Sequence, residues 1–357
     1  MAACSRAGLG AFTILVAAVA ALGADPSPSR PTSYAASFLS RHLGLRDGEL
    51  ERLRRGEVVV RMVDDPGFRE IAVMAATALP AAPAGWTSGY PLVERLRSAS
   101  PDLIVMGRFG APPSVDELAG VEVDPRLLGA LQKCHPQRCV MNASALDIER
   151  YMREIDWTSP DPHADAGRVF RSVLHQRMAE YQRRGDDALP ALANRAWELT
   201  TADAPRLLLD RRPSLAQLAP ALDARLRACA SAVTEHPSDA FYWVREKMWR
   251  REVTGLYHAT FDDERSAAGR RRVVAEKLVH ANHYLLGALT VTGLIEDDSG
   301  TYLFFLNRSE TDNRGPFNFI ERALAGRLIK RRLERQVEAL RDAFSAPVSH
   351  AARSSAP

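Results

Sequence analysis

Several kinds of sequence feature are absent or scarce in this chain of 357 residues. After the N-terminal segment, no apolar run approaches the length of about 20 residues that a membrane-spanning helix needs. The sequence contains no GxSxG nucleophile elbow, no HExxH zinc motif, no Walker loop and no dinucleotide-binding fingerprint. The formal net charge is only +3, far from the basic excess of proteins that bind DNA or RNA. We therefore expect neither a nucleic-acid partner nor a cofactor, and an enzyme is the less favoured class.

The N-terminal segment has the pattern of a cleavable secretory signal. A short polar start with Arg6 is followed by the apolar run 11–22 and by small residues that suit cleavage near Ala24. A retained membrane anchor is the alternative, but the run is short for a span and a segment rich in Pro and Ser follows it. The sequence thus predicts a signal peptide at 1–24 and an exported protein, either periplasmic or extracellular.

Cysteine is scarce, with four residues in the whole chain. Cys4 would leave with the signal peptide, and Cys134 and Cys139 enclose a short polar segment. In an oxidising compartment this spacing predicts a disulfide. A metal site is the competing interpretation, but a second pair at ligand spacing is missing, so we expect no metal. Cys229 has no evident partner, and we interpret it as a buried free thiol.

The β-rich segments predict an antiparallel sheet. Residues 58–63 and 68–79 flank an Asp-Pro-Gly turn and predict a hairpin, and 103–110 predicts a further strand. Five later segments alternate in the manner of strands, with breaks at 262–269 and at the Asp-Asp-Ser-Gly sequence 297–300. These five predict a meander, and their ranges are 241–249, 252–261, 272–280, 283–296 and 301–309.

The remaining segments predict helices. Residues 25–56 predict a leader and short helices, and 92–97 a helical turn, while 143–237 predicts a helical block. Within that block, Ser144 and Asp147 form a helix-start signal, and further helices are expected at 188–199 and 215–233. A long amphipathic helix is predicted at 317–344 and a disordered tail at 345–357. The apolar side of this helix consists of Ile320, Leu324, Leu328, Leu333, Val337, Leu340 and Phe344.

The order of these elements resembles that of a START-like helix-grip domain over residues 57–344, with the helical block at about 143–237 as an insertion. The closing stretch YLFFLNRS at 302–309, followed by GPF at 315–317 and the final helix, is similar to the end of such domains. The chain also resembles exported bacterial proteins, which implies no mechanism. The helix-grip resemblance implies an α+β fold in which an apolar ligand lies between a curved antiparallel sheet and the final helix.

The candidate binding residues are concentrated on the late strands. Strand alternation places Glu276 and His280 on one face, near His258 on the preceding strand. If that face borders a cavity, His280 could orient a ligand or act as an acid or base. An exposed strand surface is the alternative. Asn307 and Arg308, beside the turn that leads to the last helix, are further candidates, although such residues also form ordinary turns.

Three functional hypotheses follow from the sequence. The first is an exported protein that binds a lipid-like or other apolar ligand. The second is an enzyme on the same scaffold that uses His280 or His258 with Glu276. The third is a non-catalytic envelope protein whose helical block contacts a partner. The last helix also carries a basic stripe, which either contacts an anionic membrane or is an ordinary solvated face. Its residues are Arg327, Lys330, Arg331 and Arg335.

Overall fold

The structure is a computed structural model, and it describes residues 33–63, 70–83, 86–194, 199–200, 203–211, 213–227, 239–248, 251–311 and 318–345. Of these, residues 199, 200, 203, 205, 318–328 and 345 are described without their side chains. The predicted signal peptide, Cys229 and residues 346–357 of the predicted tail lie outside the described residues. None of the described helices has both the length and the apolar character needed to cross a membrane.

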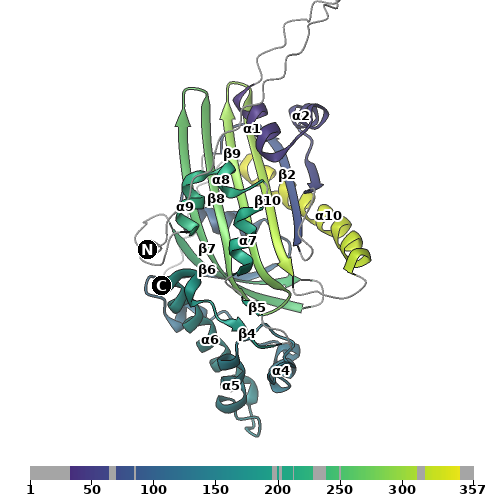
Figure 1. Cartoon of the computed structure of the whole chain (residues 1–357). Coiled ribbons are helices and arrows are strands. Elements are labelled where there is room, and N and C mark those ends of the chain that lie inside the picture. Colours follow the sequence, from purple (N-terminus) through teal and green to yellow (C-terminus); the bar gives the residue numbers. More distant parts are fainter. Residues whose placement is uncertain are drawn as a thin grey trace, which may run out of the picture. The chain divides into compact units, whose positions relative to one another are not determined.

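The fold is α+β and is built on one antiparallel sheet of eight strands, in the order β1-β2-β10-β9-β8-β7-β6-β3 (Figure 1). The predicted first hairpin and the later meander are both confirmed, and the last strand, β10, joins them by pairing with β2. The strands are β1 (Val59–Met62), β2 (Glu70–Leu79), β3 (Leu103–Phe109), β6 (Ala240–Met248), β7 (Arg251–Ser266), β8 (Gly269–Ala281), β9 (Leu285–Asp297) and β10 (Gly300–Thr311).

One predicted break in the meander is wrong. Strands β7 and β8 continue through residues 262–269 and leave only Ala267 and Ala268 as the turn. Across this extension the Arg270 Nε donates to Asp263 Oδ1 at 2.8 Å, and Arg271 pairs with Glu264. Opposite charges that face each other on paired strands stabilise a hairpin. The charge-rich composition therefore indicates a polar hairpin end here. The other predicted turn, at 297–300, is confirmed.

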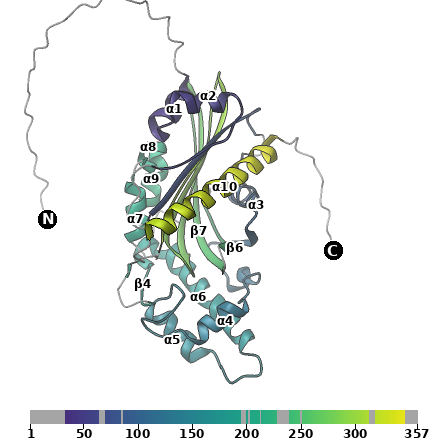
Figure 2. The ribbon, with the colours of Figure 1, turned by 90° about the vertical axis from the view of Figure 1, so that its right-hand side faces the viewer.

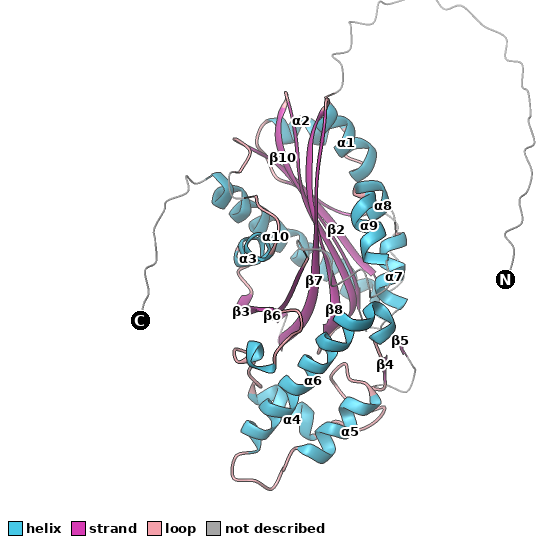
Figure 3. Ribbon diagram, turned by 90° about the vertical axis from the view of Figure 1, so that its left-hand side faces the viewer, coloured by secondary structure: helices cyan, strands magenta, loops and turns pink. Residues whose placement is uncertain are grey.

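Five helices cover part of one face of the sheet (Figure 3). They are α1 (Tyr34–Leu43), α2 (Asp47–Arg54), α7 (Asp203–Asp210), α8 (Leu215–Leu218) and α9 (Pro220–Arg227). Helix α1 begins where the Ser33 hydroxyl accepts a hydrogen bond from the Ala36 amide, and it ends at Gly44, whose φ of 64° favours glycine. Apolar side chains from these helices pack on β2, β8, β9 and β10, so this face of the sheet is buried.

A helical lobe extends from the end of the sheet and contains the helices η1 (Val115–Leu118), α4 (Pro125–Gln132), α5 (Ala145–Glu154) and α6 (Pro162–Arg184). The predicted helix start is confirmed, because the Ser144 hydroxyl accepts from the Asp147 amide and the Asp147 carboxylate accepts from the Ser144 amide. Phe241 and Trp243 of β6 pack into the core of this lobe. The lobe begins before residue 143, earlier than the sequence predicts.

The predicted disulfide between Cys134 and Cys139 is present, with an S–S distance of 1.97 Å. Its loop donates backbone hydrogen bonds to the carbonyl oxygens of Ala193 and Asn194. These bonds, together with Pro190, which has no amide hydrogen, oppose the helix that the sequence predicts at 188–199. That prediction is wrong: the segment contains η2 (Gly185–Ala188), β4 (Ala191–Leu192) and β5 (Leu199–Thr200), and the two strands pair with each other.

The second face of the sheet carries α3 (Tyr90–Ser98) and α10 (Asn318–Ser345). Helix α10 crosses this face over β1 and β2 (Figure 2). Its residues Leu333, Val337, Leu340 and Phe344 are buried, whereas the remaining members of the expected apolar set fall among its undescribed side chains. The sheet is thus covered on both faces, and the space between α10, α3 and the sheet is where the candidate site lies.

Candidate functional site

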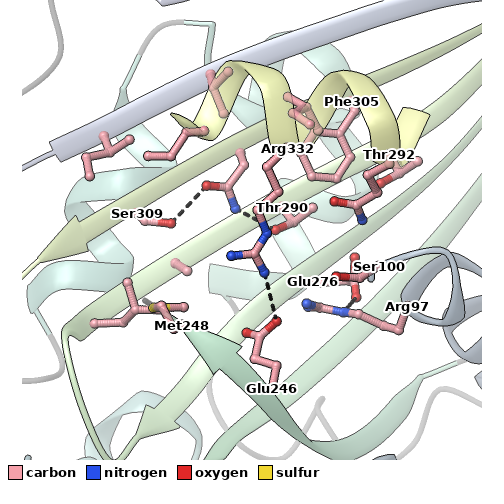
Figure 4. Close-up of a pocket in the computed structure, with 18 of the residues that line it drawn as sticks. Arg97, Ser100, Glu246, Met248, Glu276, Thr290, Thr292, Phe305, Ser309 and Arg332 are labelled. Carbon is pink, nitrogen blue, oxygen red and sulfur yellow. Dashed lines mark hydrogen bonds and ion pairs between the residues drawn. The ribbon is translucent and has the colours of Figure 1, made fainter. Parts of the chain in front are cut away.

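A cavity of about 210 Å³ lies between the second face of the sheet and the helices α3 and α10 (Figure 4). It is lined by Ile71, Val73, Leu96, Arg97, Ser100, Glu246, Met248, Tyr257, Glu276, Tyr284, Leu285, Ala288, Thr290, Thr292, Phe305, Asn307, Ser309, Thr311, Ile329, Arg332, Leu333, Gln336 and Leu340.

Strand alternation determines which side chains enter the cavity. Along β10 every second residue from Phe305 to Thr311 lines it, because successive strand side chains point to opposite faces. Phe305 is matched on the helix side by Ile329, Leu333 and Leu340. These residues form an apolar wall where α10 meets the sheet.

A band of neutral polar side chains crosses the floor of the cavity. Asn307 donates to the Thr290 hydroxyl at 2.9 Å, and the Ser309 hydroxyl donates to the Asn307 side-chain oxygen at 2.9 Å. Asn307 and Thr290 are direct cross-strand partners on β10 and β9. The cavity therefore combines an apolar wall with hydrogen-bonding groups, which suits an amphipathic ligand.

A charged cluster occupies the end of the cavity beneath α3. The Arg97 Nε donates to Glu276 Oε1 at 2.9 Å, and its Nη2 donates to the Tyr242 hydroxyl at 3.0 Å. The Tyr242 hydroxyl itself donates to the same Glu276 oxygen. The Arg97 guanidinium also lies 4.4 Å above the Tyr257 ring. Only 16% of the Arg97 side chain and 3% of the Glu276 side chain are exposed.

Burial and charge act in opposite directions on this cluster. Burial alone would lower the pKa of Arg97, but attraction to Glu276, joined by smaller contributions from Tyr242, Tyr257 and Glu246, outweighs it, so the pKa lies well above the usual value. Burial also raises the pKa of the Tyr242 hydroxyl, and Glu276 raises it further. The arginine therefore stays charged and the tyrosine stays neutral at any physiological pH.

A second charged group enters the cavity from α10. The Arg332 Nε lies 2.7 Å from Asp102, and its Nη2 lies 3.8 Å from Glu246 on β6. Figure 4 shows the Glu246 and Arg332 side chains pointing toward each other inside the cavity. This arginine therefore links the helix to the β3–β6 edge of the sheet, because Asp102 directly precedes β3 and Leu103 pairs with Glu246.

Two of the five predicted site residues, Glu276 and Asn307, line the cavity. Arg308 lies on the opposite face of β10, where it is buried and pairs with Glu70. It does not line the cavity. Asn307 and Arg308 are therefore not brought together at one site, because neighbouring residues on a strand point in opposite directions.

His258 also lies on the opposite face from Glu276. Its Nδ1 lies 3.0 Å from the Tyr181 hydroxyl of α6, and its Nε2 lies 3.2 Å from Asp239. Burial lowers the pKa of His258, although Asp239 opposes this effect. His258 and Glu276 are therefore not brought together as an acid and base.

His280 is separated from Glu276 by a bulge in β8. Leu278 pairs with Tyr257 and His280 with Leu256, which leaves Val279 as an extra residue. The expectation that Glu276 and His280 share a face is therefore wrong. The strongest charges acting on His280 come from Arg177 and Asp147 in the helical lobe. Burial, reinforced by Arg177, lowers the pKa of His280 to about 3.

Several cavity residues are missing from the sequence-based prediction. Arg97 is expected only as part of a helical turn, and Tyr257 is not singled out as a binding residue by the sequence. Arg332 lies on the last helix next to the predicted basic stripe but is not among the candidate binding residues, and it lines the cavity. The sequence alone does not indicate which strands α3 and α10 cover, so neither arginine could be assigned to the cavity.

Comparison of the chain with protein-family models, with curated proteins and with solved structures yields no match. The candidate site therefore depends on its geometry alone. Among the described residues, no group of three or more His, Cys, Asp or Glu side chains is placed to hold a metal ion.

Proposed function

We propose that the protein is an exported binding protein that holds a lipid-like or other apolar ligand between its sheet and α10, in the manner of a START-like helix-grip domain. The observation that carries this proposal is the cavity itself, with its apolar wall and polar floor. A solid interface between helix and sheet would instead have favoured a protein that only contacts partners.

The size of the cavity limits the ligand. A dry protein cavity of roughly 150 Å³ accepts benzene, whereas sites for drug-sized ligands occupy roughly 300–1,000 Å³. At about 210 Å³, this cavity suits one short chain or a small ring system. A phospholipid with two long chains does not fit unless α10 moves away from the sheet.

The disulfide supports the exported part of the proposal. Disulfides persist mainly in oxidising compartments such as the periplasm and the extracellular space. The Cys134–Cys139 bond therefore agrees with the secretory signal that the sequence predicts at 1–24. Fractionation of the producing cells, with mass measurement of the mature N-terminus, tests this part directly.

Mass spectrometry of small molecules extracted from the natively purified protein tests the binding proposal. We expect an apolar compound to be recovered with the wild-type protein and lost from Ala288→Leu, which adds a bulky side chain to the cavity lining. Ala339→Leu on the exposed side of α10 is the matched control and should retain the compound. Repeated recovery of empty wild-type protein would contradict the proposal.

A second proposal concerns the outer side of α10. Arg331 and Arg335 are exposed and Lys330 is half-buried, while Arg327 falls among the undescribed side chains. We propose that this basic stripe brings the cavity to an anionic membrane surface. Sedimentation with vesicles that contain anionic lipid should fall in Arg331→Gln/Arg335→Gln, and equal sedimentation with neutral vesicles would contradict the proposal.

A further inference from the structure

The carboxylates that line the cavity are not equally partnered. Arg97 pairs with Glu276 at 2.9 Å, whereas Arg332 pairs at 2.7 Å with Asp102, which does not line the cavity. Glu246 lines the cavity and lies 3.8 Å from Arg332. A mostly buried carboxylate without a close partner is costly, so Glu246 indicates where a positive group would bind.

Glu246 is the carboxylate that lacks a close partner. Only 12% of its side chain is exposed, and among the described residues no hydrogen bond reaches its carboxylate. Its one ion pair within the described part of the chain is the contact of 3.8 Å with Arg332, which is held more closely by Asp102 at 2.7 Å. Buried carboxylates normally accept several hydrogen bonds, so Glu246 retains acceptor capacity that faces the cavity.

Glu276 adds to the negative potential of the same cavity. Its Oε1 accepts from both Arg97 and Tyr242, while its Oε2 has no hydrogen-bond partner in the described part of the chain. Glu246 and Glu276 both act on Arg97 and on Tyr257, so the two carboxylates belong to one electrostatic environment. The two guanidiniums, in contrast, each have a carboxylate within 2.9 Å.

We infer that the ligand is a small cationic amphiphile, a protonated amine attached to a short apolar chain or ring. Its ammonium group pairs with Glu246, because an ammonium supplies the hydrogen-bond donors that this carboxylate lacks. Its apolar part lies along Phe305 and Leu333. This inference rests on the proposed binding function and adds the charge of the ligand to it.

Calorimetric titration with three probes of equal chain length tests the inference. Hexylamine, which is protonated at neutral pH, is compared with hexanoate and with 1-hexanol on the purified wild-type protein. A charge-assisted hydrogen bond to a buried carboxylate corresponds to about a tenfold gain in affinity or more. We expect hexylamine to bind at least about tenfold more tightly than either other probe.

Substitution of the carboxylate supplies the second measurement. Glu246→Gln should reduce hexylamine affinity by about tenfold and leave hexanol affinity unchanged. Glu334→Gln is the matched control, because Glu334 is exposed on α10 and does not line the cavity. It should bind all three probes as the wild type does.

Different failures identify different errors. Equal or tighter binding of hexanoate would show that the arginines select an anion, and equal binding of hexanol would show that charge is not recognised. Either result overturns the cationic ligand and leaves the binding proposal intact. If no probe binds and the extracted protein is also empty, both proposals fail. Because the wild-type comparison needs no variant, it decides the inference even if Glu246→Gln does not fold.

Discussion

Arg97→Met removes the guanidinium that pairs with the Glu276 carboxylate beneath α3. The pair is close, at 2.9 Å, and Glu276 is almost completely buried. Removal of one member of a buried ion pair typically costs about 3–5 kcal/mol, because the other charge remains without compensation. We expect Arg97→Met to lower the free energy of unfolding by about 3 kcal/mol, at the lower end because the Tyr242 hydroxyl still donates to Glu276.

The reciprocal substitution Glu276→Met and the double variant separate the energy of the Arg97–Glu276 ion pair from the cost of burying each charge alone. Glu276→Met leaves a guanidinium that keeps its contact with the Tyr257 ring at 4.4 Å and is itself partly exposed. It should cost about 2 kcal/mol. In the double variant both charges are gone, and the main remaining cost is the Tyr242 hydroxyl without an acceptor, about 1–3 kcal/mol. The double variant should therefore be less destabilised than the sum of the single variants by about 3 kcal/mol.

Urea denaturation followed by circular dichroism measures these differences. The exposed pair Arg52 and Glu57 is the matched control, with a similar distance of 2.8 Å but side chains 46% and 41% exposed. Its disruption should cost far less than that of the buried pair, because water screens exposed charges. Additive losses in the Arg97 and Glu276 double variant, or a loss for Arg97→Met no larger than that of the control, would refute the reasoning.

Three further predictions concern other parts of the fold. His280 is neutral in the folded protein because its pKa is lowered to about 3. The unfolded chain therefore binds a proton that the folded chain does not, and stability falls as the pH decreases below about 6.5. His280→Gln should weaken this pH dependence in urea titrations, and an unchanged slope would contradict the prediction. Replacement of Cys134 and Cys139 by serine should cost about 2 kcal/mol for this short loop, and a reducing agent should shift the melting temperature of the wild type but not of the variant. Gly293→Ala places a Cβ against the Phe304 ring and should destabilise the protein by about 1–3 kcal/mol, so wild-type thermal stability would exclude this close packing.

Local signals in the sequence were sufficient for much of the fold. The alternation of β10, the turn before Gly300 and the paired Ser144 and Asp147 each depend on neighbouring residues, and the structure agrees with them. The disulfide was predictable because its two cysteines are only 5 positions apart. By contrast, the helix expected at 188–199 failed because hydrogen bonds from a distant loop compete for its backbone.

The candidate site was less predictable because its partners are distant in sequence. Arg97 and Glu276 are 179 residues apart, and no periodic pattern connects them. The position of His280 depends on a single bulge, which reverses the expected face and which nothing in the flanking residues indicates. Strand alternation therefore identified Glu276 as a candidate but placed His258 and His280 beside it, whereas its contacts in the structure are Arg97 and Tyr242.

The adjacent residues Glu276 and Lys277 explain why an exposed strand surface was a reasonable but incorrect alternative for β8. Charged residues in a strand usually mark a solvated face, yet both are buried, and on opposite faces. Glu276 pairs with Arg97 of α3, and Lys277 lies 2.8 Å from Asp186 of η2. A strand can carry buried charges on both sides only if each side is covered by an element that supplies the opposite charge. The charge pattern of β8 is thus a consequence of the two helical layers, and the cavity lies where one of those layers leaves the sheet incompletely covered.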